Sequence, residues 1–120
     1  MKIAFASKDG VYVNQHFGWC KTFYQYEVNK EGYEFLKLLD SSKEIEDEIH
    51  KLGYKIQSLI DSQIVYVAQI GPKASQMVKA SNIFPMQSAA ENEKIEDVIQ
   101  KIITLANTNP PLWMQRMLLS

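Results

Sequence analysis

Hydrophobic residues change their spacing along the chain, and this change separates an early strand-rich part from a later part with helices. Three apolar or aromatic segments come first, at residues 3–7, 22–28 and 33–39. The last two flank the polar stretch 29–32, so we expect them to form an antiparallel hairpin. The first segment ends at the turn signal Asp9-Gly10. The pattern therefore predicts three strands before any helix.

The first long helix is predicted behind Ser41, because Glu44 follows at the spacing of a capping box. Apolar residues then recur at intervals of three and four, which describes one apolar face of a helix. These residues are Ile45, Ile49, Leu52, Ile56, Leu59 and Ile60. Gly53 interrupts the pattern and indicates a bend.

Strands and helices alternate in the rest of the chain. The uninterrupted apolar run 64–68 is typical of a strand buried on both faces of a parallel sheet. Pro72 suits the first turn of a helix that reaches Ala80. Residues 83–86 predict a short strand at a sheet edge, because the strand contains a proline. A last helix is expected over 93–106, with acidic residues in its first turn.

This order of elements predicts an α/β fold with a mixed five-stranded sheet and flanking helices. Right-handed crossovers make the later strands parallel, whereas the early strands are antiparallel. We expect residues 1–120 to form a single domain. Residues 109–120 form an apolar tail that begins with two prolines and contains Trp113. This tail either caps the core or docks a partner.

Composition excludes several classes of function. The net charge is −1, so the protein has no global attraction to nucleic acid or to an anionic membrane. No apolar run is long enough to span a bilayer, and no signal-peptide core precedes the first strand. The single cysteine excludes an internal disulfide. These features predict a cytoplasmic protein.

The candidate chemistry lies between residues 9 and 20, directly after the first predicted strand. His16 and Cys20 carry the two side chains that bind soft or borderline metals best, and Gly18 lies between them. We therefore predict His16 as the principal metal ligand and Cys20 as a second ligand, with Asn14 orienting the imidazole. The alternatives are a loop histidine bonded to a backbone carbonyl and a cysteine that is a small buried hydrophobe. Two ligands cannot close a structural zinc site.

Other candidate groups are fewer. The turn Gly71-Pro72-Lys73 offers backbone N–H groups and a lysine, which suit an anion. The sequence alone favours the alternative, an ordinary strand-to-helix turn. His50 is interpreted as a solvated surface residue. The sequence contains no nucleophile elbow, phosphate-cradling glycine loop or paired metal-binding histidines on a helix. The first strand also carries no carboxylate for a magnesium-dependent nuclease. We therefore expect a protein that is not an enzyme.

The segment 9–18, followed by 23–28, resembles the opening of the dinitrogenase iron–molybdenum cofactor-binding family, the group of NifX, NafY and the C-terminal domain of NifB. The similarity continues through 64–71, 82–86 and 95–105. The tail 109–116 resembles the Pro-Pro-Trp ending of NifX-type members. The resemblance therefore covers nearly the whole chain in the expected order.

The resemblance implies a ribonuclease-H-like α/β fold and a role in nitrogen fixation. It implies a metallocluster carrier for the iron–molybdenum cofactor or its iron–sulfur precursor, with nitrogenase assembly proteins as partners. The cluster-associated histidine of the family falls on His16. Iron–sulfur clusters are commonly anionic, so cofactor-binding roles are also predicted for other residues of the His16 loop and for the turn Gly71-Pro72-Lys73. The predicted set is Asn14, His16, Phe17, Gly18, Cys20, Lys21, Gly71 and Lys73, with Lys8 as a further positive charge.

A second hypothesis belongs to a different class. It describes a protein-docking or regulatory module of the same fold that binds no cluster, and it rests on the apolar residues 112–119. The two hypotheses differ in what the tail contacts and in whether His16 faces a ligand.

Overall fold

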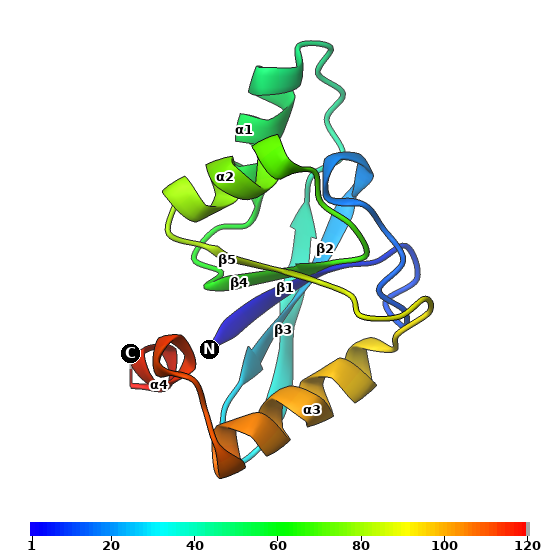
Figure 1. Cartoon of the computed structure of the whole chain (residues 1–120). Helices are drawn as coiled ribbons and strands as arrows, with labels where there is room; N and C mark the ends of the chain where they lie inside the picture. Colours follow the sequence, from blue (N-terminus) through cyan, green and yellow to red (C-terminus); the bar gives the residue numbers. More distant parts are fainter. Residues whose placement is uncertain (120) are drawn as a thin grey trace.

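A five-stranded sheet forms the centre of the computed structural model, which describes residues 1–119 (Figure 1). The strand order across the sheet is β3-β2-β1-β4-β5. The strands are β1 (Lys2–Ala6), β2 (Thr22–Val28), β3 (Tyr33–Asp40), β4 (Ile64–Val67) and β5 (Phe84–Gln87). β2 is antiparallel to both β1 and β3, whereas β4 is parallel to both β1 and β5. The sheet is therefore mixed, as the order of elements predicts.

Within residues 1–119, four α-helices and one short 3-10 helix surround this sheet. They are η1 (Phe17–Trp19), α1 (Glu48–Ser58), α2 (Pro72–Ala80), α3 (Ile95–Thr108) and α4 (Leu112–Leu118). Figure 1 shows α1 and α2 on one side of the sheet and α3 on the other, with α4 beside the N-terminus. The α/β class with a mixed sheet and flanking helices is confirmed, and it is consistent with a ribonuclease-H-like fold.

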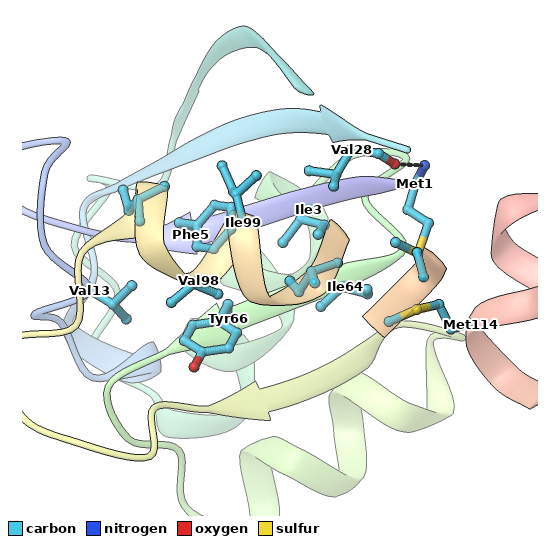
Figure 2. Close-up of a cluster of buried hydrophobic side chains, with 13 residues drawn as sticks. Met1, Ile3, Phe5, Val13, Val28, Ile64, Tyr66, Val98, Ile99 and Met114 are labelled. Atoms are coloured by element: carbon cyan, nitrogen blue, oxygen red, sulfur yellow. Dashed lines mark hydrogen bonds between the residues drawn. The ribbon is translucent and has the colours of Figure 1, made fainter. Parts of the chain in front are cut away.

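Alternation along the strands builds a separate core on each face of the sheet, because successive side chains of a strand point to opposite faces. On one face, Ile3 and Phe5 of β1 pack with Ile64 and Tyr66 of β4 against the buried side of α3 (Figure 2). On the other face, Ala4, Ala6, Val65 and Val67 pack beneath α1 and α2. All four residues of β4 are buried, as expected for a strand covered on both faces.

The start of α1 differs from the predicted one. The helix begins at Glu48, and its N-cap is Asp47, whose carboxylate accepts a hydrogen bond from the His50 N–H at 2.9 Å. The predicted capping box at Ser41 is therefore wrong, because an aspartate six positions later satisfies the same free N–H groups. Gly53 lies inside the continuous helix and does not end it.

Only part of the predicted apolar face of this helix is buried. Leu52 and Leu59 are buried, whereas Ile49 and Ile60 are exposed. The buried face also includes Lys55, a residue that hydrophobic periodicity does not select.

The apolar tail forms α4 and packs against the sheet. Met114 is 1% exposed and belongs to the core cluster that α3 covers. The Trp113 ring stacks on Phe84 of the edge strand, with ring centroids 4.3 Å apart and an interplanar angle of 11°. The tail therefore caps the core, which was one of its two predicted roles. Within residues 1–119, no helix has the length and apolar character needed to cross a bilayer.

Candidate functional site

A tightly hydrogen-bonded turn follows β1 and begins the segment that carries His16. One oxygen of Asp9, Oδ1, accepts hydrogen bonds from the N–H groups of Val11 at 2.9 Å and Tyr12 at 3.0 Å. These two donors lower the pKa of the Asp9 carboxyl, because they favour its charged form. Gly10 adopts a φ of 76°, the left-handed region that favours glycine. The signal Asp9-Gly10 thus marks a fixed turn.

The segment between this turn and His16 is bonded on both sides to the rest of the protein. The Val13 N–H donates to the Glu93 carbonyl at 2.8 Å. The Ala68 N–H donates to the Gln15 carbonyl at 3.0 Å, and the Phe17 N–H donates to the Gln69 carbonyl at 2.9 Å. His16 therefore lies between two backbone hydrogen bonds to the chain that leaves β4. An isolated parallel bridge to Gln69, just beyond the end of β4, thus holds its backbone in place.

The two residues at the start of η1 point in opposite directions. Phe17 is fully buried, and its ring lies 6.0 Å from that of Phe23 in the core beneath α1 and α2. His16 is exposed, and its ring stacks on Trp19 with centroids 5.3 Å apart and an interplanar angle of 12°. Trp19 itself is 70% exposed. Phe17 is therefore an anchor of the site, and because no part of it reaches the surface, its predicted contact with a cofactor gains no support from the structure.

A cavity of about 440 Å³ lies beside His16. Its walls come from the chain before η1, the end of β4 and the loop that follows β5: Val13, Asn14, His16, Ala68, Gln69, Ser88, Ala89, Ala90, Glu91 and Asn92. Asn14 lines this cavity together with His16. Its amide oxygen, however, accepts a hydrogen bond from the Lys8 N–H at 2.8 Å. The described side-chain contact of the imidazole is the stack on Trp19, and the hydrogen bonds described for the Asn14 side chain go to Lys8 and Asp9.

Cys20 does not face the same surface as His16. It is fully buried, and its thiol donates to the Thr22 carbonyl at 3.0 Å. Burial raises the pKa of this thiol from 9.0 to about 11, because the thiolate would lose its hydration. The prediction of a partly exposed thiolate is therefore wrong, and Cys20 has the properties of the small buried hydrophobe that was the alternative.

The remaining predicted residues separate into two groups. Gly18 and Lys21 line a second cavity on the Trp19 side of η1. Gly71 is the N-cap of α2, and Lys73 is an exposed residue in the first turn of that helix. Neither Gly71 nor Lys73 lines the His16 cavity or the Gly18 cavity. Among residues 1–119, the structure therefore does not bring all the residues predicted to bind the cofactor around one cavity.

The site offers one exposed imidazole on a rigid backbone beside an open cavity. Within the described chain, no three His, Cys, Asp or Glu side chains gather closely enough to hold a metal ion. A metal centre that already carries most of its own ligands requires only one donor from the protein, and a single exposed imidazole satisfies that requirement.

Comparison with known proteins identifies the family. The model described as dinitrogenase iron-molybdenum cofactor matches residues 1–105. The chain belongs to this family. The resemblance seen in the sequence is thereby confirmed, and membership connects the chain with nitrogen fixation and the iron–molybdenum cofactor.

Relatives of the family extend over almost the whole chain. NifX from Herbaspirillum seropedicae is 31% identical over 118 residues, which cover 97% of this chain and 80% of that protein. NifX from Azotobacter vinelandii is 29% identical over 117 residues, with coverage of 97% and 73%. NifY from Azotobacter vinelandii is 23% identical over 116 residues, with coverage of 97% and 47%.

A solved structure of a more distant protein has the same fold. The crystal structure of PH0822 superposes with a TM-score of 0.67 at 20% sequence identity, and it covers 96% of this chain and 99% of its own. At that identity the likeness establishes the architecture alone.

Sequence reasoning missed several residues around the two cavities, because their residue types and spacing do not indicate a site. Gln69 fixes the His16 backbone through its carbonyl, which any residue type supplies. Lys51 and Lys55 line the cavity beside Gly18, together with Ser41. In the sequence, only the spacing of the two lysines by one helical turn could have indicated a shared basic surface. Ordinary solvated helix faces show the same spacing, so it does not single out a cavity.

Proposed function

We propose that this protein is a non-catalytic carrier that binds the iron–molybdenum cofactor, or its iron–sulfur precursor, and hands it on during nitrogenase cofactor maturation. The observation that supports this proposal best is the His16 ring, which is exposed beside a cavity while its backbone is fixed by hydrogen bonds on both sides. A fixed backbone reduces the conformational entropy lost when the cargo binds.

A single protein ligand suits transient binding. A preformed sulfide-rich cluster brings most of its coordination with it, so an imidazole need only occupy one open position. Neutral imidazole binds iron well, and His16 is the only histidine that faces this cavity within residues 1–119. One bond also permits transfer to an acceptor, whereas a closed set of thiolates would retain the cluster.

Trp19 supports the role of His16 as a ligand. Its ring covers one face of the imidazole at 5.3 Å and thereby restricts the rotation of the histidine side chain. Because stacking uses the ring face, the ring nitrogens at the edge stay available to a metal. The other side of the cavity comes from residues 88–92, a loop of small and polar residues that leaves room for a bulky cargo.

The competing hypothesis of a docking module has lost its main observation. It rested on an exposed apolar tail, but Met114 is buried and Trp113 is stacked on Phe84. Within residues 109–119, the large apolar side chains that are exposed are those of Leu112 and Leu119, which are separated in the sequence by the buried Met114.

Anaerobic gel filtration tests the proposal. The apo-protein is mixed with isolated iron–molybdenum cofactor, or with its iron–sulfur precursor, and iron is measured in the protein peak. We expect near-stoichiometric cargo for the wild type and for His50→Ala, which removes an exposed histidine on α1. We expect little cargo for His16→Ala, with unchanged thermal unfolding. Equal iron in the two variants would refute the assignment of His16, and no iron in any of the three proteins would refute the carrier function.

A further inference from the structure

A second cavity is lined by Trp19, the residue whose ring stacks on His16, and the rest of its lining is strongly basic. Its volume is about 270 Å³, far more than the roughly 15 Å³ that one water molecule requires. Four lysines line it: Lys21, Lys43, Lys51 and Lys55. Glu44 is its one acidic residue. We refer to this cavity as the lysine pocket.

Three separate parts of the chain build the lysine pocket. Lys51 and Lys55 come from successive turns of α1, so they share one face of that helix. Lys43 comes from the segment between β3 and α1, and Lys21 lies between η1 and β2. No ion pair described within residues 1–119 involves any of these four lysines. Their charges are therefore not neutralised by protein carboxylates in direct contact.

Lys55 is the fixed member of the cluster. It is 4% exposed, and its ammonium donates hydrogen bonds to the Cys20 carbonyl at 2.6 Å and the Ser41 carbonyl at 3.0 Å. An ammonium group has three donors, so these two bonds leave one for another acceptor. Burial lowers the pKa of Lys55, and the neighbouring charge of Lys51 lowers it further. Both effects would be opposed by a negative group in the pocket.

Ser41 adds an independent observation. Its side chain is fully buried and its residue lines the lysine pocket. Its hydroxyl oxygen has no hydrogen-bond partner among the described residues. Buried hydroxyl groups nearly always have a partner, because an unsatisfied one costs free energy. Because this oxygen has almost no solvent-accessible surface, a bound acceptor would supply the missing partner once the Ser41 side chain rotates toward the pocket.

We propose that the lysine pocket is a binding site for a small, multiply charged oxyanion, carrying phosphate or carboxylate groups, held by Lys51, Lys55 and the Ser41 hydroxyl. Phosphates and carboxylates share the required chemistry, since each offers several acceptor oxygens with negative charge. This site lies outside the His16 cavity and does not depend on the binding of a metallocluster. Trp19 lines the pocket and also stacks on His16, so an occupant of the pocket contacts the residue whose ring covers the imidazole.

Isothermal titration of the apo-protein tests this proposal, with inorganic phosphate in one arm and citrate in the other, both at constant ionic strength. We expect saturable binding of at least one anion in the millimolar range or tighter. Binding of phosphate alone would assign a phosphate-bearing ligand, and binding of citrate alone would assign a polycarboxylate. Binding of both would support the oxyanion class without selectivity. No saturable binding of either anion in this range would overturn the proposal.

Variants separate a built site from general charge attraction. Lys51→Gln should weaken binding by about tenfold, because it removes one charge-assisted hydrogen bond. Ser41→Ala should weaken it severalfold without changing the net charge. Lys79→Gln is the matched control, since it removes the same charge from an exposed position at the end of α2. An equal loss of affinity in Lys79→Gln and Lys51→Gln would show general electrostatic attraction and would refute the site.

Discussion

Replacement of Met114 by alanine should destabilise the protein markedly, although this residue lies only six positions from the end of the sequence. Met114 is 1% exposed and packs in the core cluster beneath the sheet. The substitution removes three heavy atoms, and each buried methylene-sized group contributes about 0.8 kcal/mol, which gives roughly 2.4 kcal/mol. The cavity left behind adds to this cost, so roughly 2.4 kcal/mol is the minimum loss that we expect.

Thermal unfolding followed by circular dichroism measures this loss. For a domain of this size, about 1 kcal/mol corresponds to a shift in Tm of roughly 4 °C, so we expect a decrease of at least about 10 °C. Leu112→Ala is the matched control, because Leu112 lies in the same helix and is 60% exposed. Its Tm should change little. If both variants unfold at the wild-type temperature, then α4 does not cap the core and the docking hypothesis regains its main observation.

Two further predictions concern the segment that carries the site. The neutral Cys20 thiol stabilises the fold below pH 9.0, its ordinary pKa, and this stabilisation of about 2 to 3 kcal/mol should be lost as the pH rises through about 11. The free energy of unfolding should therefore fall more steeply between these pH values for the wild type than for Cys20→Ala, and equal slopes would contradict the burial of the thiol. Gly10→Ala should cost about 1 to 3 kcal/mol, because φ is 76° and an added Cβ would lie 2.7 Å from a ring carbon of Tyr24. Urea titration measures the free energy of unfolding of this variant and of Gly32→Ala, where an added Cβ meets open space and the change should be close to neutral. Equal losses of stability in the two variants would argue against strain at Gly10.

Most of the sheet could be predicted from the sequence, because strands with one or two buried faces leave a clear pattern. The range of β2 agrees with the predicted residues, and α2 begins at Pro72 and ends at Ala80 as its first-turn proline indicates. β5 lies at the sheet edge, as its proline requires. These signals are local, so they need no knowledge of the tertiary fold.

The errors arise where two local signals compete or where burial decides. Ser41 and Asp47 are both of a residue type favoured at N-caps, and the helix begins after Asp47, whose carboxylate accepts the His50 N–H. Cys20 could be an exposed ligand or a buried thiol, and its burial depends on contacts with distant elements. Ser41 and Lys55 meet through the carbonyl of Ser41, a contact across 14 positions that no spacing rule describes.

The location of His16 was predictable, but its surroundings were not. A glycine turn followed by a histidine indicates a functional loop, and the structure places that histidine beside a cavity. The predicted partners of the imidazole are different, because the Asn14 amide is bonded to Lys8 and Cys20 is buried. Trp19 instead covers the ring. Side-chain stacking within one turn depends on the backbone path, which the sequence does not specify.

The central claim of this account is that the His16 imidazole binds the cluster directly, and pulsed electron paramagnetic resonance tests it most directly. The measurement uses protein labelled with ¹⁵N-histidine and loaded anaerobically with the cofactor in a paramagnetic state. The His50→Gln background leaves His16 as the one histidine of the chain. We predict a nitrogen coupling that changes when ¹⁴N is replaced by ¹⁵N in histidine. A loaded protein whose spectrum is insensitive to this label would contradict the account, because the cluster would then be bound without the His16 imidazole.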